Sequence, residues 1–311
     1  MQAFKRTLSV LLAVVMVFGM LTVIPVSAAG TDDSESGAAK EYYQIAVGTT
    51  AVTSENYRDI LGNGTASYDP GTSTLTLNNP KLTGAMYPDE GVIYINRKEN
   101  VTIKGNYQMT DAIAKCGIES VGPITLNGNF TLIGKRGGAA SNQSVYVTGG
   151  TVNAIGATES NSVGISVGEG CNLTIADGIT RVRAKGNQLA VVTDKLILNN
   201  NRITSPQGAF FKEYYGNIIL EDFSGVANDV TIEPSNVTDY DVWVGYRRVT
   251  SANKGDVYGD GKVSYDPASK TLTLKNPTIP GGNNPAANTK FYKIFSKDDL
   301  TVKGSYTMPE T

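Results

Sequence analysis

The sequence predicts an all-β protein: a right-handed parallel β-helix, or β-solenoid, with small antiparallel hairpin caps. Three observations predict this fold. Short alternating apolar strands recur with Gly or Asn corners about every 22 residues, a long stretch occurs twice, and no 12-residue segment has a capped helical period. β-sandwich repeats are the alternative fold, because regularly spaced short strands predict them as well.

The smaller period is visible in the middle of the chain. Each unit is an alternating strand, a Gly/Asn corner and a second alternating strand, and a third short strand usually precedes it. The units begin with LTLNNPKLTG (75–84), VTIKGNYQMT (101–110), ITLNGNFTLIG (124–134), VYVTGGTVNAIG (145–156), LTIADGITRVRAKG (173–186) and LILNNNRITSPQG (196–208). Since side chains alternate between the two faces of a strand, the inward residues of successive coils stack into one apolar column. The expected anchors of this column, 21 to 28 residues apart, are Leu77, Ile103, Leu126, Val147, Ile175, Leu198 and Leu220.

The larger repeat defines the modules. GNGTASYDPGTSTLTLNNP (62–80) recurs as GDGKVSYDPASKTLTLKNP (259–277), an offset of 259 − 62 = 197 residues. Extending both copies back to Gly48 and Gly245 gives 33 positions with 18 identities. Both copies predict an antiparallel hairpin, and another short hairpin precedes each, so every module begins with a β cap that covers the exposed end of a solenoid. We expect module 1 at 41–234 (hairpin cap 41–73, coils 74–234) and an incomplete second module at 235–311, followed by further repeats of a longer chain.

The N-terminus has the pattern of a secretory signal peptide over residues 1–28. Lys5 and Arg6 precede an apolar run at 8–24, and small residues lead to a cleavage site after Ala28. An uncleaved membrane anchor is the alternative. Residues 29–40 are small and polar and are expected to form a disordered lead-in. This pattern predicts a secreted, extracellular protein, either free or attached to a cell surface.

Charge and cysteine content restrict the function classes. Removing Lys5 and Arg6 with the signal leaves 25 basic and 29 acidic residues, a net charge of 25 − 29 = −4. We therefore expect no basic surface that could bind nucleic acid, and no insertion into a membrane after signal cleavage. Secretion permits a disulfide between Cys116 and Cys171, and two buried thiols are the alternative.

Three patterns that suggest catalysis or metal binding have structural explanations. Residues 164–168 (GISVG) match the nucleophile elbow G-x-S-x-G, but the chain contains no histidine to act as a base. Arg183-Ala184-Lys185 faintly resembles a pectinase motif, and the carboxylate pairs 89–90, 221–222 and 298–299 are sequence neighbours that point to opposite faces of a strand. Carboxylates from different coils could still converge. We therefore predict no catalytic residues and no cofactor.

Calcium is the one cofactor that the sequence leaves open. Asp256 and Asp260 hint at a calcium loop, and Asp59 repeats the spacing in the first copy. The match to an EF-hand fails because Tyr258 and Pro267 occupy ligand positions. Turn formation is the alternative role of these aspartates.

Aromatic residues give the candidate ligand-binding positions. Residues 210–215 (FFKEYY) form the densest aromatic loop, with Phe211, Tyr214 and Tyr215 as candidates, and Tyr87 is expected in an earlier loop. Aromatic rings offer flat apolar faces with a polar end, which suits binding platforms. The alternative is that these rings cover the apolar core.

The signal peptide, the repeated motif and the Gly/Asn corners together resemble a family. They are similar to the repeat modules of large secreted or cell-surface proteins of Gram-positive anaerobes, described as carbohydrate-binding-domain or β-helix repeat proteins. The resemblance covers about 41–311 and is carried by structural positions at 52–54, 59, 62, 64, 67–70 and 74–77 and their counterparts from 249 to 274. It implies binding of polysaccharide, with calcium and acidic polysaccharides sometimes involved.

These observations favour a non-catalytic extracellular module that binds polysaccharide or a surface glycan. The first alternative is a structural stalk or adhesin spacer of a larger surface protein. The second is a pectin-type polysaccharide lyase or hydrolase. An aligned row of exposed aromatic or acidic side chains favours binding, whereas carboxylates clustered with a cation in a groove favour an enzyme.

Overall fold

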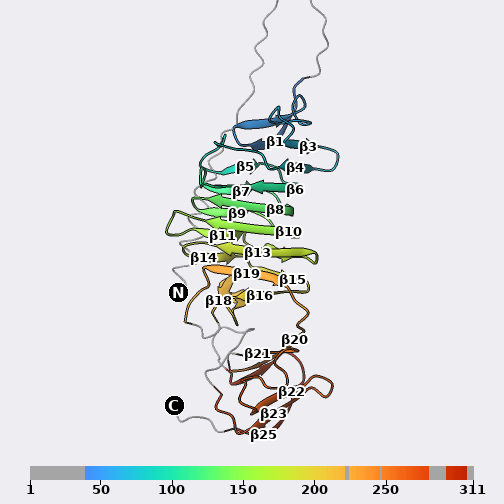
Figure 1. Ribbon diagram of the computed structural model, residues 1–311, viewed down its shortest axis with the longest axis vertical. Helices are drawn as coiled ribbons and strands as arrows, with labels where there is room; N and C mark the ends of the chain where they lie inside the picture. The colour runs from blue at the N-terminus through green and yellow to red at the C-terminus, as the bar shows by residue number, and fades with distance from the viewer. Residues whose placement is uncertain (1–38, 221–223, 246, 280–291, 307–311) are drawn as a thin grey trace, which may run out of the picture. The chain divides into compact units, whose positions relative to one another are not determined.

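The computed structural model describes residues 39–220, 224–245, 247–279 and 292–306 (Figure 1). In these ranges the protein consists of β-strands and one short 3-10 helix. Stacked parallel strands form a β-solenoid of about five turns, with antiparallel sheets besides, so the predicted fold class is confirmed. The predicted signal peptide lies outside the described residues, as does the lead-in up to residue 38. Within the described ranges we find no apolar helix of membrane-spanning length.

Sheet A is the seven-stranded sheet, with the order β14-β11-β9-β7-β5-β1-β2. The strands from β5 to β14 pair in parallel, one per coil, whereas β1 pairs antiparallel with both β2 and β5. The strands of sheet A are β1 (Tyr42–Val47), β2 (Thr50–Thr53), β5 (Gly91–Ile95), β7 (Cys116–Ser120), β9 (Gly137–Ser141), β11 (Val163–Val167) and β14 (Leu189–Val192).

Sheet B has ten strands, eight of them in the order β16-β19-β13-β10-β8-β6-β4-β3. The remaining two extend the stack, because β12 pairs with β10 and β15 pairs with β12. The strands of sheet B are β3 (Ala66–Asp69), β4 (Thr74–Asn78), β6 (Val101–Gln108), β8 (Ile124–Gly134), β10 (Val145–Gly156), β12 (Asn172–Ile175), β13 (Ile179–Lys185), β15 (Lys195–Leu198), β16 (Asn201–Ser205) and β19 (Asp229–Pro234). The predicted cap hairpins are present, since β1 with β2 and β3 with β4 are antiparallel pairs.

The apolar core lies between the two sheets and follows the predicted column with a change at each end. The register places Ile103, Leu126, Val147, Ile175 and Leu198 side by side in successive coils. Two predicted anchors were wrong. Leu75, not Leu77, pairs with Ile103, because both leucines of TLTL point inward and Leu77 is paired with Gly105. Leu220 lies just beyond the hairpin strand β18, outside sheet B.

Glycines allow the long strands of sheet B to bend. Gly105, Gly128 and Gly150 lie inside β6, β8 and β10, so that two predicted strands of each coil join into one bent strand. Gly105 has φ of 99°, a conformation that side chains with a Cβ rarely adopt. A Cβ atom at Gly128 would lie 1.9 Å from the carbonyl oxygen of Gly105. The stacked coils therefore require glycine at this corner.

The regular parallel stack ends with an antiparallel strand. β19 lies between β13 and β16 and is antiparallel to both. The Arg183 guanidinium donates two hydrogen bonds to Asp229 of β19, at 2.9 and 2.6 Å. Before β19, β17 (Phe210–Lys212) and β18 (Asn217–Ile219) form a hairpin around the 3-10 helix Glu213–Tyr215.

The second module repeats the start of the first. Its strand orders, β21-β20-β24 and β22-β23-β25, correspond to β2-β1-β5 and β3-β4-β6 of module 1. A separate apolar cluster that includes Val244 and Leu272 forms its core. Its strands are β20 (Asp239–Val244), β21 (Arg247–Thr250), β22 (Val263–Asp266), β23 (Thr271–Lys275), β24 (Ile294–Ser296) and β25 (Thr301–Ser305).

The two cysteines are not bridged. Cys116 is buried in β7 of sheet A, and Cys171 precedes β12 of sheet B. The structure therefore contains two free thiols, and the alternative of two buried thiols holds for Cys116, whereas Cys171 is only partly buried.

Candidate functional site

One position of each parallel strand in sheet A is partly exposed on the outer face. These positions are in register from coil to coil, and neighbouring strands of a sheet lie about 4.8 Å apart. From β5 to β14 the column is Tyr94, Glu119, Ala140, Ser166 and Val192. An aromatic and an acidic side chain thus adjoin a strip of small side chains along the solenoid.

Tyr87 and Tyr94 form an aromatic pair at the start of this column. Tyr87 lies in the turn before β5, where its carbonyl oxygen accepts a 3.0 Å hydrogen bond from the Glu90 amide. The two ring centroids are 5.1 Å apart and the rings are tilted by 59°. Tyr87 is 47% exposed, whereas Tyr94 is partly buried. We call Tyr87 and Tyr94 the first platform.

An ion cluster joins two coils beside the first platform. Lys115 Nζ lies 3.2 Å from Glu119 Oε1 and 3.5 Å from Glu90 Oε2. The corner loops hold these groups together, because the Lys115 amide donates to the Pro88 carbonyl and the Cys116 amide donates to that of Glu90. Glu90 comes from the first coil and Lys115 from the second, so carboxylates from different coils converge here.

The protonation behaviour of the cluster follows from its partial burial. Burial raises the pKa of the Glu119 carboxyl, which Lys115 opposes and Glu90 reinforces. Burial alone would lower the pKa of Lys115, but the two glutamates outweigh it and the pKa lies above its usual value. Burial, with both glutamates, also raises the pKa of Tyr94. At neutral pH the lysine is therefore charged and the Tyr94 phenol is neutral.

The predicted aromatic loop lies elsewhere. Tyr214 and Tyr215 are exposed in the 3-10 helix, with ring centroids 5.1 Å apart, and Lys212 Nζ lies 5.1 Å from the Tyr215 centroid. Phe211 is partly buried against the main core, which is the alternative role considered for these rings. This hairpin is fixed beside β14, where the Thr193 amide donates to Gly216. Four strand spacings in sheet A separate β14 from β5, so the structure does not join these tyrosines to Tyr87.

The predicted calcium aspartates organise their own loops. Asp256 accepts backbone hydrogen bonds from the amides of Gly259, Asp260 and Gly261, at 2.8 to 3.2 Å. Asp59 accepts two equivalent bonds from residues 63 and 64. Across the described ranges, no group of three or more His, Cys, Asp or Glu side chains is arranged to hold a metal ion. The turn role accounts for these geometries, and calcium binding stays a prediction.

The other sequence patterns also have defined places. Ser166 of the G-x-S-x-G match lies in the outward column, and Gly164 packs against β13, where a Cβ would meet the Lys185 amide. Arg183 is paired with Asp229. Of the carboxylate pairs, 221–222 lies outside the described residues, and Asp298 lies 3.9 Å from Lys270.

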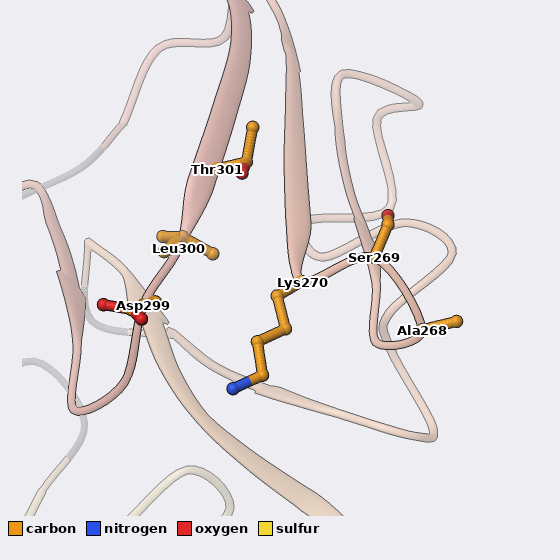
Figure 2. Close-up of a pocket in the computed structure, with 6 residues that line it drawn as sticks. All are labelled: Ala268, Ser269, Lys270, Asp299, Leu300 and Thr301. Atoms are coloured by element: carbon orange, nitrogen blue, oxygen red, sulfur yellow. The ribbon is translucent and has the colours of Figure 1, made fainter.

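A shallow hollow is present in the second module, where Lys270 and Asp299 of the 298–299 carboxylate pair are among its lining residues (Figure 2). It lies between the turn joining β22 to β23 and the start of β25. No aromatic side chain and no predicted site residue lines it. The lining residues are Ala268, Ser269, Lys270, Asp299, Leu300 and Thr301.

The sequence interpretation found Tyr87 but missed its partners. Tyr94 was recognisable as the one polar-ended side chain in GVIYI (91–95), at an outward position of the alternation. Lys115 and Glu119 gave no signal, because their meeting with Glu90 depends on the length of the corner between coils.

The stacked parallel strands place this chain among the parallel β-solenoid proteins. No protein family, curated protein or solved structure known to us matches it at a significant level. The resemblance to carbohydrate-binding repeat proteins therefore stays a prediction.

Proposed function

We propose that this protein is a non-catalytic extracellular module that binds polysaccharide on the outer face of sheet A. The observation that carries the proposal is the first platform, in which an exposed tyrosine packs on a second tyrosine of the outward column. The flat face of an aromatic ring contacts the C–H groups of a sugar ring, while phenol and carboxylate oxygens accept hydrogen bonds from its hydroxyls.

The remainder of the column supports an extended ligand. Beyond Glu119 the outward side chains are Ala140 and Ser166, which leave the strip open. A polymer lying along the solenoid axis would cross one strand about every 4.8 Å. Glu119 belongs to the column itself, and its ion pairs with Lys115 and, through Lys115, Glu90 give the strip a set of charged hydrogen-bonding groups at its Tyr94 end.

Native affinity electrophoresis tests this proposal with soluble polysaccharides in the gel. The panel contains hydroxyethyl cellulose, xylan, galactomannan and polygalacturonate, each with and without calcium. We expect at least one polysaccharide to retard the intact chain and Tyr87→Ala to weaken the retardation about tenfold. Tyr42→Ala is the matched control, because Tyr42 is exposed but lies outside the column. No retardation by any polysaccharide would favour the structural stalk instead.

A polysaccharide hydrolase or lyase is the second candidate, favoured by the convergence of Glu90, Glu119 and Lys115. In that case Glu119, whose pKa is raised by burial, is the group to donate a proton to a leaving oxygen. Incubation with the same panel would then release reducing or unsaturated ends, and Glu119→Gln would abolish the release. Binding without release of ends supports the non-catalytic module.

A further inference from the structure

The second module contains an aromatic residue at the place of Tyr94. In module 1, Tyr94 of β5 is paired with Ala46 of β1. In module 2, Phe295 of β24 is paired in the same way with Trp243 of β20. Because β24 and β20 occupy the places of β5 and β1, Phe295 occupies the outward position that Tyr94 has in module 1.

An exposed tyrosine accompanies this residue in both modules. Tyr292 precedes β24 and is 43% exposed, and its ring centroid lies 6.3 Å from that of Phe295. Tyr87 contacts Tyr94 at 5.1 Å from a different position in the chain, because it lies 94 − 87 = 7 residues before its partner and Tyr292 lies 295 − 292 = 3 residues before Phe295. Both modules therefore place an exposed tyrosine against the aromatic residue of the outward position.

Trp243 lies beside Phe295 on the same face of the sheet, because the two residues are directly paired across β20 and β24. It is only 4% exposed, and its ring lies 5.6 Å from that of Phe295. Arg248 and Lys297 lie over the tryptophan, at 4.9 and 5.9 Å from its centroid. The indole is thereby fixed in the structure, which leaves Tyr292 and Phe295 as the accessible rings.

The charges around the two aromatic pairs are different. Two glutamates and one lysine flank the first platform. In module 2 the neighbouring charges are two cations, Arg248 and Lys297, and two carboxylates, Asp239 and Asp241. What the two sites share is therefore a pair of aromatic faces and not a charge pattern.

We propose that Tyr292 and Phe295 form a second glycan platform, so that one chain binds a polysaccharide at two sites through uncharged sugar rings. The inference rests on the proposed function of the first platform. Two linked sites on one polymer raise the apparent affinity well above that of either site, because the second contact forms at high effective concentration.

The test compares the intact chain with Tyr87→Ala, Tyr292→Ala and the double variant, in gels that contain the polysaccharide of the panel above that retards the intact chain most. We expect each single variant to lose roughly tenfold or more in apparent affinity for the polymer, and the double variant to migrate as in a gel without polysaccharide. Calorimetric titration with a short oligosaccharide of the same sugar should give two sites in the intact chain and one in each single variant.

Two outcomes separate this inference from the proposed function. If Tyr292→Ala binds like the intact chain while Tyr87→Ala abolishes binding, the second platform is wrong and the first remains. If Tyr87→Ala has no effect, or no polysaccharide retards the intact chain, the proposed function fails and the inference with it. Tyr292→Phe keeps the ring and should bind normally, which separates loss of the ring from misfolding.

Discussion

Glu119 shows how one outward residue can depend on the coil beside it. Its carboxyl is partly buried between strands and shares Lys115 with Glu90 of the preceding coil. Burial disfavours the charged carboxylate, so its pKa lies above the usual value. Because the pKa is higher in the folded than in the unfolded chain, the carboxyl stabilises the fold most at low pH, and this contribution is lost as the pH rises.

Glu119→Gln should therefore change the pH dependence of stability. The free energy of unfolding of the natural chain minus that of the variant should decrease as the pH rises from about 4 to 7. The reason is that only the natural chain must ionise a partly buried carboxyl. Urea unfolding at several pH values measures this difference. Glu159→Gln, at an exposed position, is the control. A difference that increases with pH would contradict the expectation.

Gly128→Ala should destabilise the solenoid strongly. The added Cβ would lie 1.9 Å from the Gly105 carbonyl oxygen, which the backbone cannot move aside without breaking the ladder. We expect a loss of more than about 3 kcal/mol in the free energy of unfolding. Gly170→Ala is the control, because Gly170 also has positive φ but no atom near its Cβ, and it should cost about 1 kcal/mol. Equal costs would show that the close approach is unimportant.

At the scale of elements, β19 shows that one antiparallel strand can end a parallel stack. Its inward residues Val230 and Ile232 are buried like those of a parallel coil. β19 runs antiparallel to both of its neighbours, β13 and β16. The two hydrogen bonds from Arg183 to Asp229 join it to β13.

Asp229→Asn should weaken the attachment of β19 modestly. Both side chains are more than a third exposed, so solvent screens the pair and we expect a loss of at most about 1 kcal/mol at pH 7. Arg183 lowers the pKa of Asp229, so the stabilisation is present at neutral pH and is lost as the pH falls below about 4. Urea unfolding at pH 7 and pH 2.5 measures this loss. A difference that survives in 1 M salt or at pH 2.5 would contradict the ion pair as its cause.

At the scale of the whole molecule, each module has an apolar cluster of its own. Leu272 is fully buried in the second cluster, and its truncation to alanine should cost about 2–5 kcal/mol there. Hydrogen exchange should then increase in β20–β23, while β6, β8 and β10 keep their protection. Increased exchange in both groups of strands would show that the modules unfold together. Thr273→Ala, on the same strand, is a milder control.

The sequence predicted the solenoid because its inward residues repeat and its corners need Gly or Asn. The sequence did not determine which leucine, Leu75 or Leu77, pairs with Ile103, since both are at inward positions of the same alternation. The structure shows that Leu75 pairs with Ile103 and Leu77 with Gly105. The antiparallel β19 was missed because the alternation of apolar and polar residues does not indicate whether a strand pairs parallel or antiparallel with its neighbours. Tyr87 was predicted, but Glu90 meets Glu119 only through the geometry of the corner loops, which sequence spacing does not determine.

The outward column of sheet A has a consequence for how such a surface can change over time. Residues 94, 119, 140, 166 and 192 differ in size and charge, although the strands that display them keep one register. Each coil can therefore exchange its displayed side chain while the interior stays intact. Substitutions at these five positions would thus change the size and charge of the outer face on an unchanged scaffold.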